Sequence, residues 1–182
     1  MPVIDDSART ELRARQGAGA RYDAPSAPAE DLLLARRGTA FFARKLMELD
    51  DSGLFQPSAV PGLTRAHVVA KVSYAARAHA LAFDMLTGAD TGDYDPNPDI
   101  GLAATLPARA LRHLFKHSEV HLNVCWRDLS SAHWDQTVTL PDGTGALART
   151  LPLRRAAMIW QSAIDLGNGA SVSDMPEGIK LG

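Results

Sequence analysis

The chain has 182 residues, of which 46% are hydrophobic, so it is long enough and apolar enough for one domain with a continuous core. Its 19 basic and 21 acidic residues give a net charge of −2, which offers no basic surface for a nucleic-acid partner. The single cysteine, Cys125, excludes an intramolecular disulfide. No stretch approaches the roughly 20 apolar residues that cross a bilayer, and the N-terminus lacks a signal-like pattern, so we expect a cytoplasmic protein without a membrane partner.

The N-terminal part of the sequence predicts an arm followed by a long helix. Residues 1–29 mix Arg, Ala, Gly and Pro, which favours an extended arm with one short helix near Ala8–Gln16. From Glu30, leucines and phenylalanines recur with helical spacing up to Asp50, where the sequence Asp-Asp-Ser-Gly ends the pattern. We therefore place the arm at 1–29 and the folded domain at 30–182.

The middle of the sequence predicts two more helices and a long connection between them. Thr64 is a suitable N-cap for a helix over Arg65–Leu86, because its hydroxyl can accept from free backbone N–H groups. Ala89–Ile100 carries Gly, Pro and four Asp without periodicity, and long loops of this kind often carry function. Pro107 then opens a helix that continues to about Asp128.

The C-terminal part predicts a short hairpin and a last helix. Thr137–Leu140 and Gly145–Leu147 flank a turn and favour two short strands. A helix follows Thr150 and ends near Leu166. Four long helices joined by turns and one large loop favour an antiparallel four-helix bundle, so the predicted fold class is all-α with a short hairpin.

Histidines recur every four residues on the third predicted helix. His113, His117 and His121 are followed by Cys125 at the same spacing, and any adjacent pair can bind one divalent ion such as Zn²⁺. The ends of the series lie about 18 Å apart, so all of them cannot share one ion, and a pair needs a third ligand from elsewhere. The sequence equally allows His113 and His121 as partly exposed polar residues and Cys125 as a small core residue.

A second polar series lies on the second predicted helix. His67, Lys71, Ala75 and His79 share one face of this helix, close to Tyr74. Periodicity does not decide whether this face lines the interior or meets solvent.

Sequence blocks along the chain carry a family resemblance. They are Leu34–Thr39, Pro61–Val68, Leu111–Ser118 and Arg155–Gly167. In this order they resemble successive blocks of the mycothiol-dependent maleylpyruvate isomerases, over roughly Leu32 to Ile179. The resemblance implies the helical-bundle domain of that family, which is related to the DinB-like metalloenzyme bundles, without the smaller C-terminal domain of the full-length isomerases.

The resemblance also implies a degenerate metal site. In that family a divalent metal, usually zinc, is held by a His in the Thr-Arg-x-His block and by a Glu and a His four residues apart on the last helix. His67 matches the first ligand, whereas Met158 and Ser162 occupy the other two positions. A thioether suits Cu(I) more than Zn²⁺, and a neutral hydroxyl is a poor zinc ligand. We therefore expect no zinc at this site, and mycothiol remains a candidate cofactor.

The leading functional hypothesis is an enzyme that acts on a small organic acid or biosynthetic intermediate by isomerisation, cyclisation or thiol addition. His67 would act as general acid or base, Lys71 as electrostatic stabiliser or base, and Tyr94 as a hydrogen-bond donor. Burial of Lys71 would favour its neutral form, which is the form of a base or a Schiff-base lysine. The candidate substrate contacts are Arg65, Met158, Trp160 and Ser162.

Two rival hypotheses remain open from the sequence. The first is a non-catalytic protein that binds a ligand or a partner on the same scaffold, which would fit the replaced metal ligands directly. The second keeps a metal but moves it to the third helix, on His117 with His113 or His121. The sequence also leaves a homodimer open.

Overall fold

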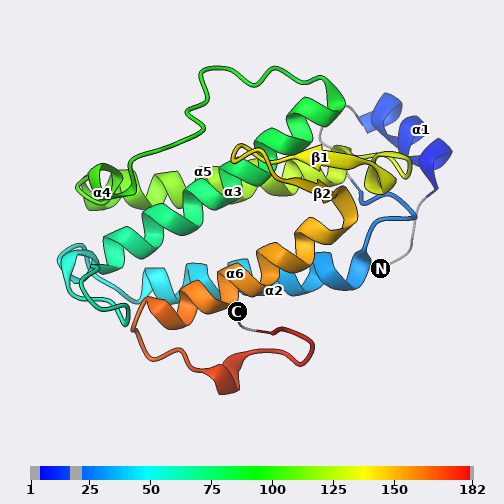
Figure 1. The fold of residues 1–182 in the computed structure, drawn as a ribbon. Coiled ribbons are helices and arrows are strands. Elements are labelled where there is room, and N and C mark those ends of the chain that lie inside the picture. The colour runs from blue at the N-terminus through cyan, green and yellow to red at the C-terminus, as the bar shows by residue number, and fades with distance from the viewer. Residues whose placement is uncertain (1–4, 17–21, 181–182) are drawn as a thin grey trace.

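The computed structural model describes residues 5–16 and 22–180, and long helices dominate it (Figure 1). The long helices are α2 (Ala29–Met47), α3 (Arg65–Thr87), α5 (Ala108–Asp128) and α6 (Leu151–Asp165). The shorter elements are α1 (Asp6–Gln16), α4 (Ile100–Ala103), and an antiparallel hairpin of β1 (Thr137–Thr139) and β2 (Gly145–Leu147). A mainly helical fold with a short hairpin is therefore confirmed. Within the described ranges, no helix is long and apolar enough to cross a membrane.

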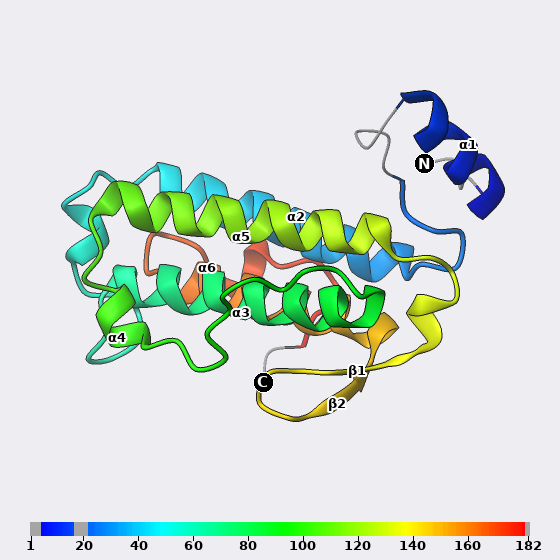
Figure 2. The same ribbon diagram turned by 90° about the horizontal axis from the view of Figure 1, so that it is seen from above.

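The helix directions differ from the simple antiparallel arrangement that the sequence predicts. Figures 1 and 2 show α3 and α5 running side by side in the same direction. Helices α2 and α6 also run side by side in the same direction as each other, which is opposite to that of α3 and α5. The cause is the connection over residues 88–107, which returns along the bundle to α4 before α5 begins. A long crossover connection of this kind makes consecutive helices parallel.

The α2–α6 interface depends on a glycine. A Cβ atom at Gly38 would lie 2.5 Å from Ile159 Cγ2 and 2.8 Å from Trp160 Nε1, which is closer than side-chain atoms pack. Trp160 fills the adjacent space, where its ring stacks on Phe41 at 4.9 Å between centroids and its Nε1 donates to Leu34 O at 3.2 Å. The absence of a side chain at Gly38 therefore allows the two helices to approach closely.

Arginines satisfy the carbonyl groups at the ends of several long helices. Arg9 of α1 donates to the carbonyls of Arg127 and Leu129 at the end of α5, at 2.6 and 3.3 Å. Arg112 donates to Leu46 O and Leu49 O at the end of α2, at 2.8 and 2.7 Å. The last carbonyls of a helix lack the i+4 N–H partner that the earlier ones have, and the negative end of the helix dipole also favours a cation.

Contacts to the bundle hold the described part of the N-terminal arm. The short helix expected near Ala8–Gln16 is present as α1 and begins at Asp6, and Arg9 holds it against the end of α5. The guanidinium of Arg36 on α2 also donates two hydrogen bonds to the Asp23 carboxylate, at 2.6 and 2.7 Å. The parts of the predicted arm at 1–4 and 17–21 lie outside the described residues.

A buried ion pair links the long helices through their interior. Arg155 of α6 is fully buried, pairs with Glu119 of α5, and donates to Val72 O of α3 at 2.9 Å. The second carboxylate oxygen of Glu119 accepts from the Thr39 hydroxyl of α2 at 3.1 Å. Residues from α2, α3, α5 and α6 therefore meet in one polar network inside the bundle.

Candidate functional site

A cavity of about 380 Å³ lies beside the first turns of α3. The turn before α3, the helix itself, α4 and the end of α6 supply its walls, which are Val60, Leu63, His67, Val68, Lys71, Ile100, Gly101, Ser162 and Asp165. Four of these side chains are apolar, and four polar side chains, those of His67, Lys71, Ser162 and Asp165, lie between them. This is the usual composition of a site that binds a small molecule.

His67 enters this cavity from the first turn of α3, where it also completes the helix start. The backbone N–H of Thr64 donates to His67 Nδ1 at 3.3 Å, and the Thr64 hydroxyl lies 2.9 Å from the same nitrogen. Because Nδ1 accepts from a backbone N–H, the neutral imidazole carries its proton on Nε2. Nε2 makes no hydrogen bond to the described residues, so His67 offers the cavity an N–H donor.

Lys71 and two groups of α6 provide the other polar groups. Lys71 lies one turn after His67 on the same face of α3 and is exposed. Its exposure places the amine at the edge of the cavity and not in its interior, where the neutral base or Schiff-base role would require it to be buried. Ser162 is buried, and Asp165, three residues later, accepts from Gln161 Nε2 at 2.7 Å.

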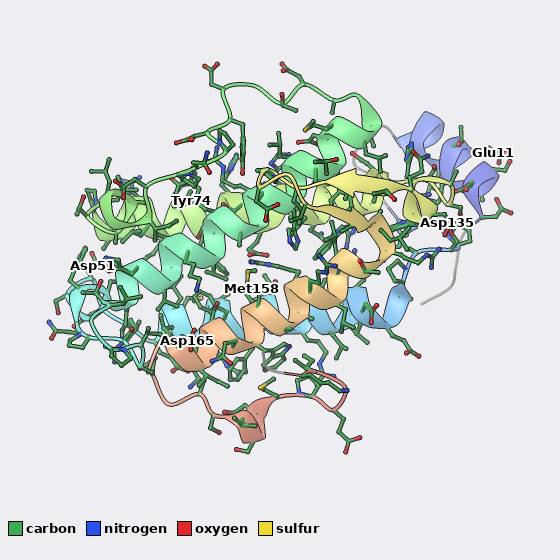
Figure 3. The ribbon with its side chains drawn as sticks, in the orientation of Figure 1. Glu11, Asp51, Tyr74, Asp135, Met158 and Asp165 are labelled. Atoms are coloured by element: carbon green, nitrogen blue, oxygen red, sulfur yellow. The ribbon has the colours of Figure 1, made fainter. Side chains whose placement is uncertain are left out.

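Several sequence-predicted site residues lie elsewhere. Met158 occupies the middle of α6 (Figure 3), is not among the residues that line the cavity, and its Sδ accepts from Arg155 Nη1 at 3.7 Å. Trp160 is committed to the α2–α6 interface. Arg65 donates to the carbonyls of Leu166 and Gly167, each at 2.9 Å, so its guanidinium supports the end of α6 instead of facing the cavity. Of the three family ligand positions, His67 and Ser162 line the same cavity, and Met158 is not among its lining residues.

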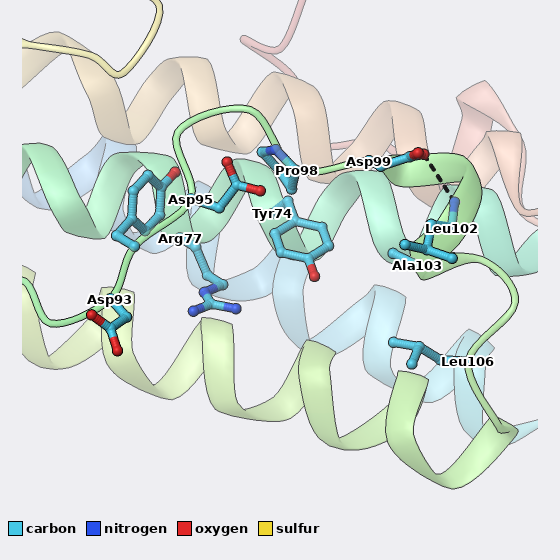
Figure 4. A pocket seen from close by; sticks show the side chains of 10 residues that line it. Tyr74, Arg77, Asp93, Asp95, Pro98, Asp99, Leu102, Ala103 and Leu106 are labelled. Atoms are coloured by element: carbon cyan, nitrogen blue, oxygen red, sulfur yellow. Dashed lines mark hydrogen bonds between the residues drawn. The ribbon is translucent and has the colours of Figure 1, made fainter.

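Tyr94 lines a second cavity of about 350 Å³, which it shares with Tyr74, Arg77 and the acidic loop. Figure 4 shows Tyr74 and Arg77 on α3 beneath the loop that carries Asp93 and Asp95. Burial raises the pKa of Tyr94, so its hydroxyl stays protonated. Residues of α4 line both cavities, and Tyr94 is not among the residues that line the cavity of His67.

The donor set around the first cavity does not fit the metal that the family resemblance implies. His67 is the one imidazole among the residues that line the cavity. Ser162 offers a neutral hydroxyl, and Asp165 adds one carboxylate, whereas a zinc site needs three ionic or imidazole ligands. The cavity therefore offers acid–base and cationic groups instead of a three-ligand metal centre.

His79 lies in the core of the protein, two turns beyond Lys71 on α3. Burial lowers its pKa to about 3, and the charges of Arg155 and Arg154 act in the same direction. Its Nδ1 finds no hydrogen-bond partner among the described residues. The polar series on α3 thus divides between the cavity and the core.

Acid is expected to destabilise the protein through His79. Its pKa is about 3 in the folded chain and 6.5 in the unfolded one, so between these values only the unfolded chain binds the proton, and stability falls as the pH falls. The expected loss between pH 7.5 and pH 5 is about 2 kcal/mol. Denaturant unfolding at the two pH values measures it, with His79→Leu flattening the dependence and the exposed His113→Leu leaving it unchanged. An equal dependence in His79→Leu and the unsubstituted protein would exclude His79 as the cause.

Comparisons with known proteins agree with the observed helical fold. A family model described as the mycothiol maleylpyruvate isomerase N-terminal domain matches residues 35–166. The crystal structures of the mycothiol-dependent maleylpyruvate isomerase and of a histidine-to-alanine mutant of it each share 34% identity with the chain and superpose with a TM-score of 0.74. Each match covers 82% of this chain and 65% of the other, so the chain spans just under two thirds of those proteins. No curated protein sequence matches the chain.

Proposed function

The chain belongs to the mycothiol maleylpyruvate isomerase family, and we propose that it is an enzyme that transforms a small organic acid in the His67 cavity without the three-ligand zinc of the family. The observation that carries the proposal is the presence of His67, Lys71 and Ser162 around one cavity of about 380 Å³. The imidazole donates a proton or hydrogen bond, the ammonium attracts a carboxylate, and the hydroxyl orients a polar group.

The reaction that these groups serve best is thiol-assisted isomerisation of a double bond conjugated to a carbonyl. A thiolate adds to the carbon–carbon double bond and forms a C–S bond. The π electrons of the double bond shift toward the carbonyl carbon, and the carbonyl π electrons move to the oxygen, so that an enolate forms. The carbon–carbon bond, now single, rotates, and return of the electrons expels the thiolate unchanged. The N–H of His67 is suited to stabilise the oxygen as its charge develops, because a donor placed in advance loses no reorganisation energy.

Lys71 is suited to bind the substrate carboxylate. Its ammonium lies at the edge of the cavity, four residues from His67 and on the same face of α3. A positive charge at the edge of a cavity attracts anions and so raises their local concentration at the site. Mycothiol, the thiol named for the related isomerases, is our candidate for the attacking group.

Turnover of maleylpyruvate, with and without mycothiol, tests this proposal. We expect conversion to the trans isomer in the presence of the thiol, and a Lys71→Met variant should raise KM with little change in kcat, because it removes uniform binding of the carboxylate. Arg37→Met is a matched control, since Arg37 is an exposed cation on α2 that does not line the cavity. Tight binding of maleylpyruvate without any conversion would instead support the non-catalytic hypothesis.

A further inference from the structure

A compact group of side chains lies near the C-terminal ends of α3 and α5, away from the cavity. Asp84 of α3 and His121 and Cys125 of α5 place one ligand atom each within 4.8 Å of one another. His121 Nε2 lies 2.9 Å from Asp84 Oδ2, and Cys125 Sγ lies 3.3 Å from Asp84 Oδ1. Asp84 is 17 residues after His67 on one continuous helix, or about 25 Å at ~1.5 Å per residue, so this group is independent of the proposed active site.

The parallel arrangement of α3 and α5 creates this group. His121 and Cys125 are four residues apart and share a face of α5, and α5 packs along α3, which presents Asp84 to that face. A small cavity of about 100 Å³ adjoins the three side chains and is also lined by Thr87 and Asp128. This volume is sufficient for a water molecule beside the ligand atoms.

We propose that Asp84, His121 and Cys125 bind one Zn²⁺ ion, with a water molecule as the fourth ligand. Imidazole nitrogen, thiolate sulfur and carboxylate oxygen are the ligands that zinc takes in proteins, and three protein ligands with water complete a tetrahedron. Bonds of about 2.0–2.3 Å place tetrahedral ligand atoms about 3.3–3.8 Å apart, so small side-chain movements bring these atoms into position. Mg²⁺ and Ca²⁺ fit poorly, because the group holds one carboxylate and they prefer oxygen ligands throughout.

Binding of a divalent ion at this group releases one proton. In the structure the Cys125 thiol donates to Asp84 Oδ1 at 3.3 Å. When the ion binds, the S–H bond breaks, an S–Zn bond forms, and the proton passes to solvent. The thiolate and the Asp84 carboxylate then carry two negative charges, which balance the two positive charges of the ion.

His113 and His117 are not part of the proposed site. They continue the series on α5, with ring centroids 6.0 Å apart, but both are exposed, and His117 lies 6.4 Å from His121 between ring centroids. Among the described residues, no third candidate ligand joins His117 with His113 or His121, so our proposal uses His121 with Cys125 and Asp84.

Titration of metal-free, tag-free protein with Co²⁺ tests the proposal, with Cys125 kept reduced by a phosphine. We expect one Co²⁺ per chain, a near-ultraviolet thiolate-to-cobalt band and the intense visible bands of a four-coordinate ion, all displaced by one equivalent of Zn²⁺. Cys125→Ser should remove the thiolate band. Asp84→Asn and His121→Gln should each weaken Zn²⁺ binding by about 10–100-fold or more, because removal of a residue that only hydrogen-bonds to a metal ligand already causes a loss of this size. His113→Ala is the matched control and should bind as the unsubstituted protein does.

Circular dichroism spectra of each variant show whether weaker metal binding reflects loss of a ligand or loss of folding. Substitution of the half-exposed His121 is the change least expected to disturb packing. A Co²⁺ spectrum without a thiolate band would overturn the proposal and leave a hydrogen-bonded triad. A spectrum that persists in Cys125→Ser, or that disappears in His113→Ala, would also overturn it.

Discussion

Replacing His67 with Gln is expected to lower kcat by about 10²- to 10⁴-fold, which is the usual contribution of a positioned acid or base. The same change should leave stability nearly intact. A glutamine at this third helical position can accept from the Thr64 N–H as the imidazole does, which is the common form of a capping box. The variant therefore separates the chemical role of the ring from its structural one.

Steady-state kinetics together with thermal unfolding measure both halves of this expectation. His133→Gln is a suitable control, because His133 Nδ1 likewise accepts from a backbone N–H, that of Ser130 at 3.1 Å, but lies far along the chain from the cavity residues. If His67→Gln keeps full turnover, the imidazole has no catalytic role. If the turnover of His67→Gln falls only in proportion to the fraction of protein that is folded, the role of the imidazole is structural.

Arg155→Met is expected to lower the free energy of unfolding by about 3–5 kcal/mol, because it leaves the buried Glu119 carboxylate without its partner. Adding Glu119→Gln should recover most of this loss, since the amide removes the buried charge and still accepts from the Thr39 hydroxyl. The double variant therefore tests whether an unpaired charge, and not lost packing, causes the destabilisation.

Denaturant unfolding gives these free energies. Arg149→Met provides the control, because the pair of Arg149 with Asp135 is exposed and surface pairs contribute at most about 1 kcal/mol. A loss below about 1 kcal/mol in Arg155→Met, or equal losses in the single and double variants, would contradict the role given to this ion pair.

The helices and their ends could be predicted from the sequence because their signals are local. Thr64 and Pro107 precede helix starts, and Gly88 adopts the left-handed conformation, with φ of 71°, that ends α3. The directions of the helices could not be predicted in this way. The long connection after Gly88 has no periodicity that indicates where it returns, and its course alone makes α3 and α5 parallel.

The same limit explains which site residues the sequence missed. Asp165 could have been found, because it lies three residues after Ser162 and shares its face of the helix. Asp84 could not, since it meets His121 and Cys125 only through the parallel packing of α3 on α5. The sequence of the long loop likewise does not indicate which cavity Tyr94 lines, and the structure places it in the second cavity instead of beside His67.

The central claim is that the His67 cavity works without a three-ligand metal. The most direct measurement compares maleylpyruvate turnover in the presence of mycothiol before and after exhaustive treatment with a chelator, in the unsubstituted protein and in Cys125→Ser, which lacks the thiolate of the second proposed site. We predict equal turnover in all four samples, with metal content confirmed as negligible after treatment. Loss of turnover on chelation in Cys125→Ser, restored by one equivalent of Zn²⁺, would contradict the account.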